Sequence, residues 1–334
     1  MPRLMWREPI ETATIRSRPA ADAAPPAAPG APSAPSAPSA PSGGEVAAPA
    51  GAPALLTAGA PAPRSRVVTL GDVAGRESGG LVVLLVAVGA LTLASNVFLT
   101  GSNLSNLARQ VAIFGIIAVG QLLVILTGGI DLAVGSVLGL SGAVTAELLV
   151  AGWVIPPAIL AGIVLGGALG LANGLLVTRA KLPPFIATLG MLGIARGAVL
   201  VITKAKTVLP LPKPFESLAN GTVAGIPNLL VVAVVVTVGV SFVLKRTVFG
   251  RYVDAVGSNP ESARLAGVPV RAVTVSVYAI SGLLAGLGGV LLASRLGAGI
   301  PTAGTGFELN AIAACVIGGA SLFGAKGSAL GAAT

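Results

Sequence analysis

The sequence predicts an all-α membrane protein, a polytopic bundle of transmembrane helices. Hydrophobic residues make up 54% of the 334-residue chain, charged residues make up only 10%, and the mean hydropathy is +0.91. An ordinary soluble domain carries about 25% charged residues. The apolar residues also gather in runs of roughly 20, the length that a helix needs to cross about 30 Å of hydrocarbon. Composition and patterning together exclude a soluble protein.

Residues 1–78 differ from the rest of the chain in composition. They hold 14 of the 25 prolines, including the repeat APSAPSAPSAPS from Ala31 to Ser42, and they show no hydrophobic periodicity. Such a segment cannot bury enough apolar surface to offset the entropy lost on ordering. We therefore expect a disordered, Pro/Ala/Ser-rich cytoplasmic tail over 1–78 and a transmembrane domain over 79–334.

Eight apolar runs follow the tail, the last of them shorter than the others. Short loops rich in Lys and Arg stay on the cytoplasmic side of a membrane. Eleven such residues fall in the set of connections that includes the tail, against four in the alternate set, which predicts a cytoplasmic N-terminus. The runs lie at about 79–98, 107–127, 134–151, 156–178, 184–203, 227–244, 273–293 and 309–323.

The fourth run carries a row of glycines on one helical face. Gly162, Gly166, Gly170 and Gly174 fall four residues apart. Small residues at this spacing let two helix backbones approach closely inside a membrane. The row predicts that this helix packs against another helix and does not face lipid on all sides.

The segment from Lys245 to Arg271 is the long polar stretch between the sixth and seventh runs. It carries five basic residues, which predicts a cytoplasmic location. A helix standing free of the bilayer there is a surface for a soluble partner. From the residues alone, a plain connector between two spans is an equal alternative.

The middle of this segment has the signals of a short helix. Ser258 or Asn259 suits the N-cap, and Pro260 suits the first helical position. Glu261 favours the positive end of the helix dipole, and Gly267 ends the helix. We expect a helix over roughly 259–267.

The stretch GQLLVILTGGIDLAVGSVLGLSG, Gly120 to Gly142, contains a glycine pair and several polar residues, among them Gln121, Asp131 and Ser136. An ionisable residue at membrane depth is a functional candidate, and a glycine break frees backbone groups that must be buried or line a cavity. The alternative is a tight cytoplasmic turn in which Asp131 caps the next helix. The turn is favoured because the number of spans requires one here.

Further polar groups lie in or beside the spans, namely Arg109, Glu147, Asn173, Arg196 and Asn310. Such side chains either line a translocation path or form interhelical hydrogen bonds and reach the interface. The candidates for a translocation path are Gln121, Asp131, Ser136, Asn173 and Asn310.

Motifs for catalysis, metal binding and nucleotide binding are missing from the sequence. The chain has no histidine, a single cysteine, and no G-x-x-x-x-G-K-[ST] loop, G-x-G-x-x-G or G-x-S-x-G motif. We therefore expect no catalytic residue, no metal site and no cofactor bound by this chain.

The net charge of +9 sits at the ends of apolar runs, where it fixes topology, so nucleic acid is not implied. The sequence therefore favours a permease whose energy is supplied by another protein. A secondary, ion-coupled transporter is the main alternative, and the scarcity of intramembrane acids argues against it.

Three segments resemble one family. GQLLVILTGGIDLAVGS (Gly120 to Ser136), GRYVDAVGSNPESARLAGVPV (Gly250 to Val270) and PTAGTGFELNAIAACVIGGASLFGAKGS (Pro301 to Ser328) are similar to the membrane permease of bacterial ABC importers of the ribose, xylose and autoinducer-2 type. The resemblance covers about 79–334. It implies an inner-membrane subunit that forms the path for a sugar.

The resemblance also implies partners and roles. It implies a second permease subunit, identical or paralogous, a periplasmic sugar-binding protein, and a cytoplasmic ATPase that binds ATP with Mg²⁺ and hydrolyses it. It implies about ten helices, so we expect the last one or two to be missing from this sequence. It assigns the short cytoplasmic helix to docking on the ATPase, through Asn259, Glu261, Arg264, Leu265 and Gly267.

Overall fold

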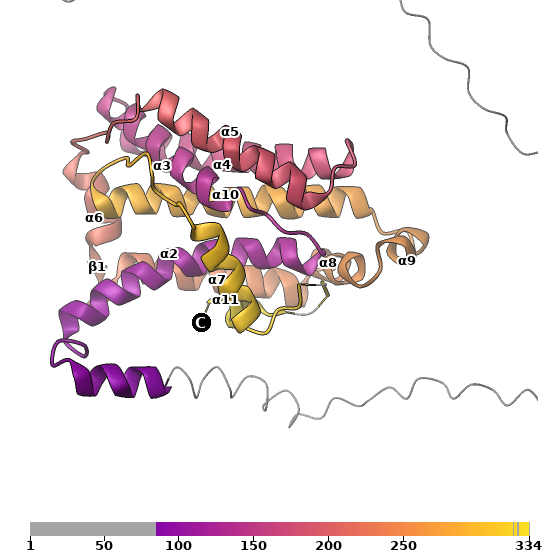
Figure 1. Ribbon diagram of the computed structural model, residues 1–334, viewed down its shortest axis with the longest axis horizontal. Coiled ribbons are helices and arrows are strands. Elements are labelled where there is room, and N and C mark those ends of the chain that lie inside the picture. The colour runs from indigo at the N-terminus through magenta and orange to yellow at the C-terminus, as the bar shows by residue number, and fades with distance from the viewer. Residues whose placement is uncertain (1–84, 323, 326, 334) are drawn as a thin grey trace, which may run out of the picture. The chain divides into compact units, whose positions relative to one another are not determined.

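The computed structural model describes residues 85–322, 324–325 and 327–333. The tail expected over 1–78 and the first residues of the expected run at 79–98 lie outside the described residues. The regular structure in the described part is almost entirely helical (Figure 1). Five of its helices are long and apolar enough to cross a membrane: α2 (Gly101–Leu126), α4 (Ile155–Thr178), α5 (Pro184–Ile202), α7 (Asn228–Arg246) and α10 (Val270–Leu296). The prediction of a polytopic helical bundle is confirmed.

Shorter elements connect and flank these five helices. Three are apolar helices, Leu85–Ala94, α3 (Val134–Val150) and α11 (Phe307–Ile317). The remaining ones are α6 (Lys213–Asn220), the antiparallel pair β1 (Thr222–Val223) and β2 (Ile226–Pro227), α8 (Val248–Ser258), α9 (Pro260–Leu265) and α12 (Ala329–Ala333).

Helix α10 is the centre of the bundle. It packs most extensively against α4 and also contacts α3, α2 and α6. In Figure 1 it runs between α3, α4 and α5 on one side and α2 and α7 on the other. The C-terminal half of α2 is buried as well, because α7, α10, α11 and α12 all pack against it. Helices α2 and α10 thus satisfy their own backbone hydrogen bonds and bury much of their surface against their neighbours.

Three of the four glycines in the row of α4 face the backbone of α10, and Gly162 faces Thr145 and Ser141 of α3. A Cβ atom added at Gly166 would lie 2.8 Å from the Cα of Gly286, and one added at Gly174 would lie 2.8 Å from the Cα of Val275. One added at Gly170 would lie 2.9 Å from the Cα of Gly282. Real Cβ atoms do not approach other heavy atoms so closely. The two helices are therefore as close as their backbones permit.

The last predicted span is wrong in length. Helix α11 ends at Ile317, whereas the apolar run extends to 323. Gly318 and Gly319 stop the helix, and Gly319 adopts φ +87°, which favours glycine. The amide of Ala320 then donates to the carbonyl of Cys315 at 2.9 Å and closes the turn. Eleven helical residues reach only about 16 Å, roughly half of the hydrocarbon thickness.

The polar segment before α9 contains a second helix that the sequence signals did not identify. In α8 the hydroxyl of Thr247 caps the helix by accepting a hydrogen bond from the amide of Gly250 at 3.4 Å. Only Gly250, Val253 and Val256 of α8 are buried, three residues apart on one face. So narrow an apolar stripe belongs to a helix lying on the bundle and not to one crossing a membrane.

Replacing Gly170 with leucine should prevent assembly of the bundle, because its side chain would overlap the carbonyl oxygen of Tyr278 and the backbone of Gly282. We expect loss of monodisperse protein after extraction in detergent, measured by size-exclusion chromatography. The matched control is Gly239→Leu in α7, where an added Cβ meets nothing within 4 Å. Equal yields of the two variants would contradict the packing of α4 on α10.

Candidate functional site

Helix α9 is a capped helix at the end of the bundle where α10 begins. The side-chain oxygen of Asn259 accepts hydrogen bonds from the amides of Glu261 at 3.0 Å and Ser262 at 2.9 Å, which makes Asn259 the N-cap. Ser258, the other candidate, ends α8 and donates to the carbonyl of Asp254. Gly267 follows the helix with φ +83°, as expected of a residue that ends one.

The outer face of α9 carries a pair of opposite charges and one large apolar side chain. The guanidinium of Arg264 donates to the carboxylate of Glu261, with Nε at 3.1 Å from Oε2. That hydrogen bond and charge hold the pKa of Glu261 below its ordinary value. Leu265 is 76% exposed, whereas Ala263 on the inner face is buried. The helix is therefore anchored on one side and presents Glu261, Arg264 and Leu265 on the other.

Three of the translocation-path candidates form one network where α2 passes into α3. In the amide orientation that satisfies both groups, Gln121 donates to the carbonyl of Asp131 at 3.0 Å and accepts from its amide at 3.2 Å. The carboxylate of Asp131 accepts from the amide of Ala133 at 2.9 Å, and Ser136 donates to the carbonyl of Ala133 at 2.9 Å. The three side chains are buried. They hold the turn between α2 and α3 in shape.

Asp131 stabilises this turn without being the N-cap of α3. We expected Asp131 to be the N-cap. The N-cap position is instead Ala133, two residues later, and Ala133 has no side-chain cap. Asp131 lies outside both helices and is 2% exposed. Burial raises the pKa of its carboxyl to about 6, and the hydrogen bond from Ala133 lowers the pKa by a smaller amount.

The other two candidates lie apart from this network. Asn173 in α4 is fully buried, and neither its nitrogen nor its oxygen has a partner among the described residues. Asn310 in α11 is exposed. The geometry thus brings together Gln121, Asp131 and Ser136, and leaves Asn173 and Asn310 separate.

A second polar network, which the sequence patterns did not connect, joins α5 to the segment between α10 and α11. The guanidinium of Arg196 donates to the carbonyls of Pro301 at 3.2 Å and Ala303 at 2.9 Å. Oε1 of Glu308 accepts from the amide of Gly306, while its Oε2 is buried with no partner among the described residues. The signal in the sequence was an arginine in the middle of an apolar run.

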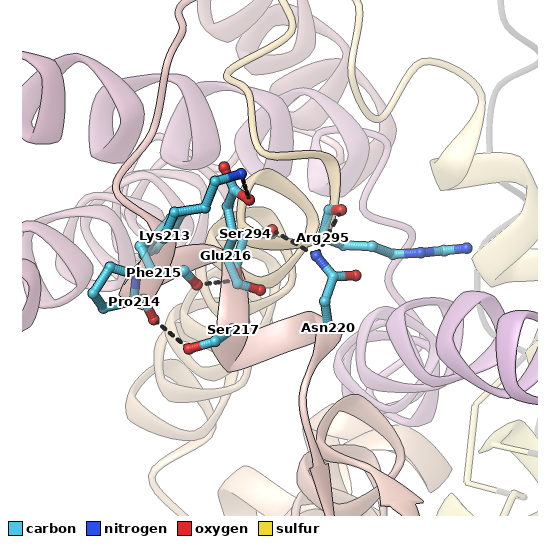
Figure 2. A network of polar contacts seen from close by, with 8 residues as sticks. All are labelled: Lys213, Pro214, Phe215, Glu216, Ser217, Asn220, Ser294 and Arg295. Atoms are coloured by element: carbon cyan, nitrogen blue, oxygen red, sulfur yellow. Dashed lines mark hydrogen bonds and ion pairs between the residues drawn. The ribbon is translucent and has the colours of Figure 1, made fainter.

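At the far end of α10, a polar network fixes α6 (Figure 2). The hydroxyl of Ser294 donates to the carbonyl of Phe215 at 2.6 Å and accepts from the amide of Ala219 at 3.1 Å. The side-chain amide of Asn220 donates to the carbonyl of Arg295 at 3.2 Å. Both ends of α10 therefore carry a short polar helix, α9 at its start and α6 at its end.

The described residues hold no group of three or more His, Cys, Asp or Glu that could bind a metal ion. Five helices of membrane length, of which α10 is the central span, define a polytopic membrane protein. This chain belongs to the family of branched-chain amino acid transport system permease components, whose family model matches residues 103–333. It is accordingly a multi-pass protein of the inner membrane and a transport component, not an enzyme.

Curated relatives agree with this assignment. The ribose import permease protein RbsC of Bacillus subtilis is 43% identical over 254 residues, covering 75% of this chain and 78% of that protein. RbsC of Escherichia coli K12 is 39% identical over 262 residues, covering 76% and 81%. The xylose transport system permease protein XylH of Escherichia coli K12 is 36% identical, covering 80% and 85%. No solved structure matches the chain.

Replacing Asp131 with asparagine should flatten the pH dependence of stability. The folded pKa of about 6 lies above the ordinary value of 3.8, so folding favours the protonated carboxyl. The stability it contributes is complete below about pH 4 and is lost as pH rises through about 6, a change on the order of 3 kcal/mol. The measurement is the free energy of unfolding in detergent between pH 4 and 8.

The control for this experiment is Ser136→Ala. It removes a hydrogen bond from the same network without removing a titratable group, so it should lower stability equally at every pH. Parallel profiles for the wild type and Asp131→Asn would show that the carboxyl is not buried in the folded protein.

Proposed function

We propose that this chain is the membrane subunit of an ATP-binding cassette importer that carries a ribose- or xylose-like monosaccharide. The observation that carries the proposal is the 36–43% identity to relatives named as ribose and xylose permeases. A D-allose permease and an L-arabinose ABC transporter permease are similar at 41% and 38%. These relatives favour an importer subunit over a secondary, ion-coupled transporter.

In this proposal the end of the bundle that carries α9 faces the cytoplasm. The connections at that end and the helix ends beside them hold more basic residues than the opposite end, as expected for a cytoplasmic face. We propose a cytoplasmic N-terminus as well, because the connections that include the N-terminal tail carry the excess of Lys and Arg in the sequence. The basic residues at the α9 end are Arg179, Lys181, Lys245, Arg246, Arg251, Arg264 and Arg271, and those at the opposite end are Arg109, Lys204, Lys206, Lys213 and Arg295.

The cytoplasmic partner is an ATPase subunit that binds ATP with Mg²⁺, and α9 is the helix that docks on it. Support comes from the cap at Asn259 and the outward side chains Glu261, Arg264 and Leu265. Only the short stretch from Ala266 to Pro269 separates α9 from α10. A displacement of α9 by the ATPase would thus act directly on the central helix and shift the bundle between outward-open and inward-open states.

The opposite end is the surface for a periplasmic sugar-binding protein. The side chain of Lys213 on α6 is 89% exposed, and Lys204 and Lys206 are also exposed. A surface of this charge speeds association with an acidic partner. A second permease subunit, identical or paralogous, completes the translocation path.

Reconstitution in liposomes tests the transport function. The chain, combined with its ATPase and binding protein, should take up radiolabelled ribose or xylose only when ATP and Mg²⁺ are present on the ATPase side. A matched preparation with a non-hydrolysable ATP analogue should take up none. Uptake driven by a sodium or proton gradient without ATP would instead identify a secondary transporter.

Replacing Gly267 with valine should uncouple the ATPase without affecting insertion. The backbone of Gly267 has φ +83°, where a β-branched residue is strained, so the end of α9 would be displaced. Arg264→Glu should act similarly by replacing the outward charge. We expect normal amounts in the membrane and loss of most sugar-stimulated ATP hydrolysis.

The control is Gly225→Val, in the turn between β1 and β2. Gly225 has φ +82° and open space around it, so the local strain is the same. It lies beyond the other end of α7, a helix of about 28 Å, and so away from α9. Stimulated hydrolysis at the wild-type rate in Gly267→Val and Arg264→Glu would make α9 a plain connector.

A further inference from the structure

A cavity lies behind α9, on the side turned toward the bundle. Its volume is about 260 Å³, just below the range of about 300–1,000 Å³ for ligand pockets, and it is open to solvent on one side. Its walls come from the turn after α2, the end of α4, the start of α5, α8, the first residue of α9, and α10. It adjoins the turn that the Gln121 network stabilises, and the residues of the Arg196 network do not line it.

One face of α10 supplies this cavity with polar groups at increasing depth. Arg271, Thr274 and Tyr278 lie three and four residues apart, so they point to the same side of the helix. Arg271 is exposed at the start of α10, whereas Tyr278 is 1% exposed, about 10 Å further along the axis. The cavity therefore has a cationic mouth, and the buried side chain of Tyr278 lies at its base.

The mouth suits an anion. Arg271 has no ion-pair partner among the described residues. In the first turn of the 27-residue helix α10, the amides of Val270 and Val273 bond to carbonyls, whereas those of Arg271 and Ala272 find no partner in the described part of the chain. Free amides, the helix dipole and a guanidinium together form a phosphate-binding arrangement.

The base of the cavity suits neutral hydroxyl groups. The hydroxyl of Tyr278 is buried and has no partner among the described residues, although a buried hydroxyl normally has one. The hydroxyls of Thr127, Thr178 and Thr274 already donate to backbone carbonyls of their own helices, so their lone pairs remain as acceptors. Asp131 interacts electrostatically with Tyr278 and disfavours an anion at this end.

We propose that this cavity binds a phosphorylated polyol, with the phosphate at Arg271 and the start of α10 and the hydroxyl groups at Tyr278 and the three threonines. Two molecules share this chemistry, a soluble sugar phosphate and the headgroup of phosphatidylglycerol. A bound ligand bridges α10 to Pro260, the first residue of α9, and so holds α9 in one position. That this would restrain transport rests on the coupling role proposed for α9. The binding itself does not.

Equilibrium binding of radiolabelled ribose 5-phosphate to the purified full chain tests the site without any transport step. In detergent free of anionic lipid we expect saturable binding that ribose alone does not displace. Arg271→Gln should weaken it about tenfold or more, and Tyr278→Phe roughly threefold to tenfold. Because the replaced groups are an exposed cation and an unpartnered hydroxyl, both variants should fold.

The matched control is Arg251→Gln, which removes an exposed cation of α8 that does not line the cavity. It should bind like the wild type.

Nanodiscs distinguish the two sources of the ligand. If phosphatidylglycerol nanodiscs abolish binding of ribose 5-phosphate and phosphatidylcholine nanodiscs do not, and the chain retains phosphatidylglycerol through Arg271, the lipid headgroup is the occupant.

If binding persists in phosphatidylglycerol nanodiscs, the sugar phosphate is the occupant. The proposal is overturned if the wild type binds neither molecule, or if Arg271→Gln and Arg251→Gln weaken binding equally. Failure of sugar uptake in the reconstituted importer would leave these binding results unchanged, so the two proposals fail independently.

Discussion

The contact between α4 and α10 is the constraint on which the rest of the structure depends. Between helices in a membrane the hydrophobic effect contributes little, because lipid tails are as apolar as the side chains. Close packing must supply the attraction instead, and the glycines of α4 and α10 allow it by bringing the backbones together. Since α10 also contacts α3, α2 and α6, its position against α4 sets where these three helices pack.

The polar groups inside the bundle follow from the same environment. Each buried donor or acceptor lacks water, so it needs a partner in the protein. Gln121 satisfies both backbone groups of Asp131, and Ser294 both donates to and accepts from α6. Asn173, Tyr278 and Ser281 are buried exceptions without partners in the described part of the chain. A bound ligand or a change of conformation would supply the hydrogen bond that each of these groups lacks.

The sequence predicted the features that depend on local signals. The expected bounds of the spans that became α3, α4 and α5 agree with the structure to within one residue, because turn residues and prolines delimit them. The cap at Asn259 could also be predicted, since Asn259 accepts hydrogen bonds from residues only two and three positions further along the chain. What failed was the length of α11, where two glycines outweigh an apolar run, and α8, whose apolar face is too narrow to register as a run.

The site was less predictable because its contacts join distant parts of the chain. Gln121 and Asp131 meet only once α2 has turned back, and Arg196 reaches Pro301 across more than a hundred residues. The cavity behind α9 was even harder to predict from the sequence, since its lining comes from six separate segments. At the cavity, α10 is held by backbone contact with α4, whereas α9 is anchored by the buried Ala263 and a short connection to α10. Because Pro260 of α9 lines the cavity, motion of α9 would change the volume of the cavity.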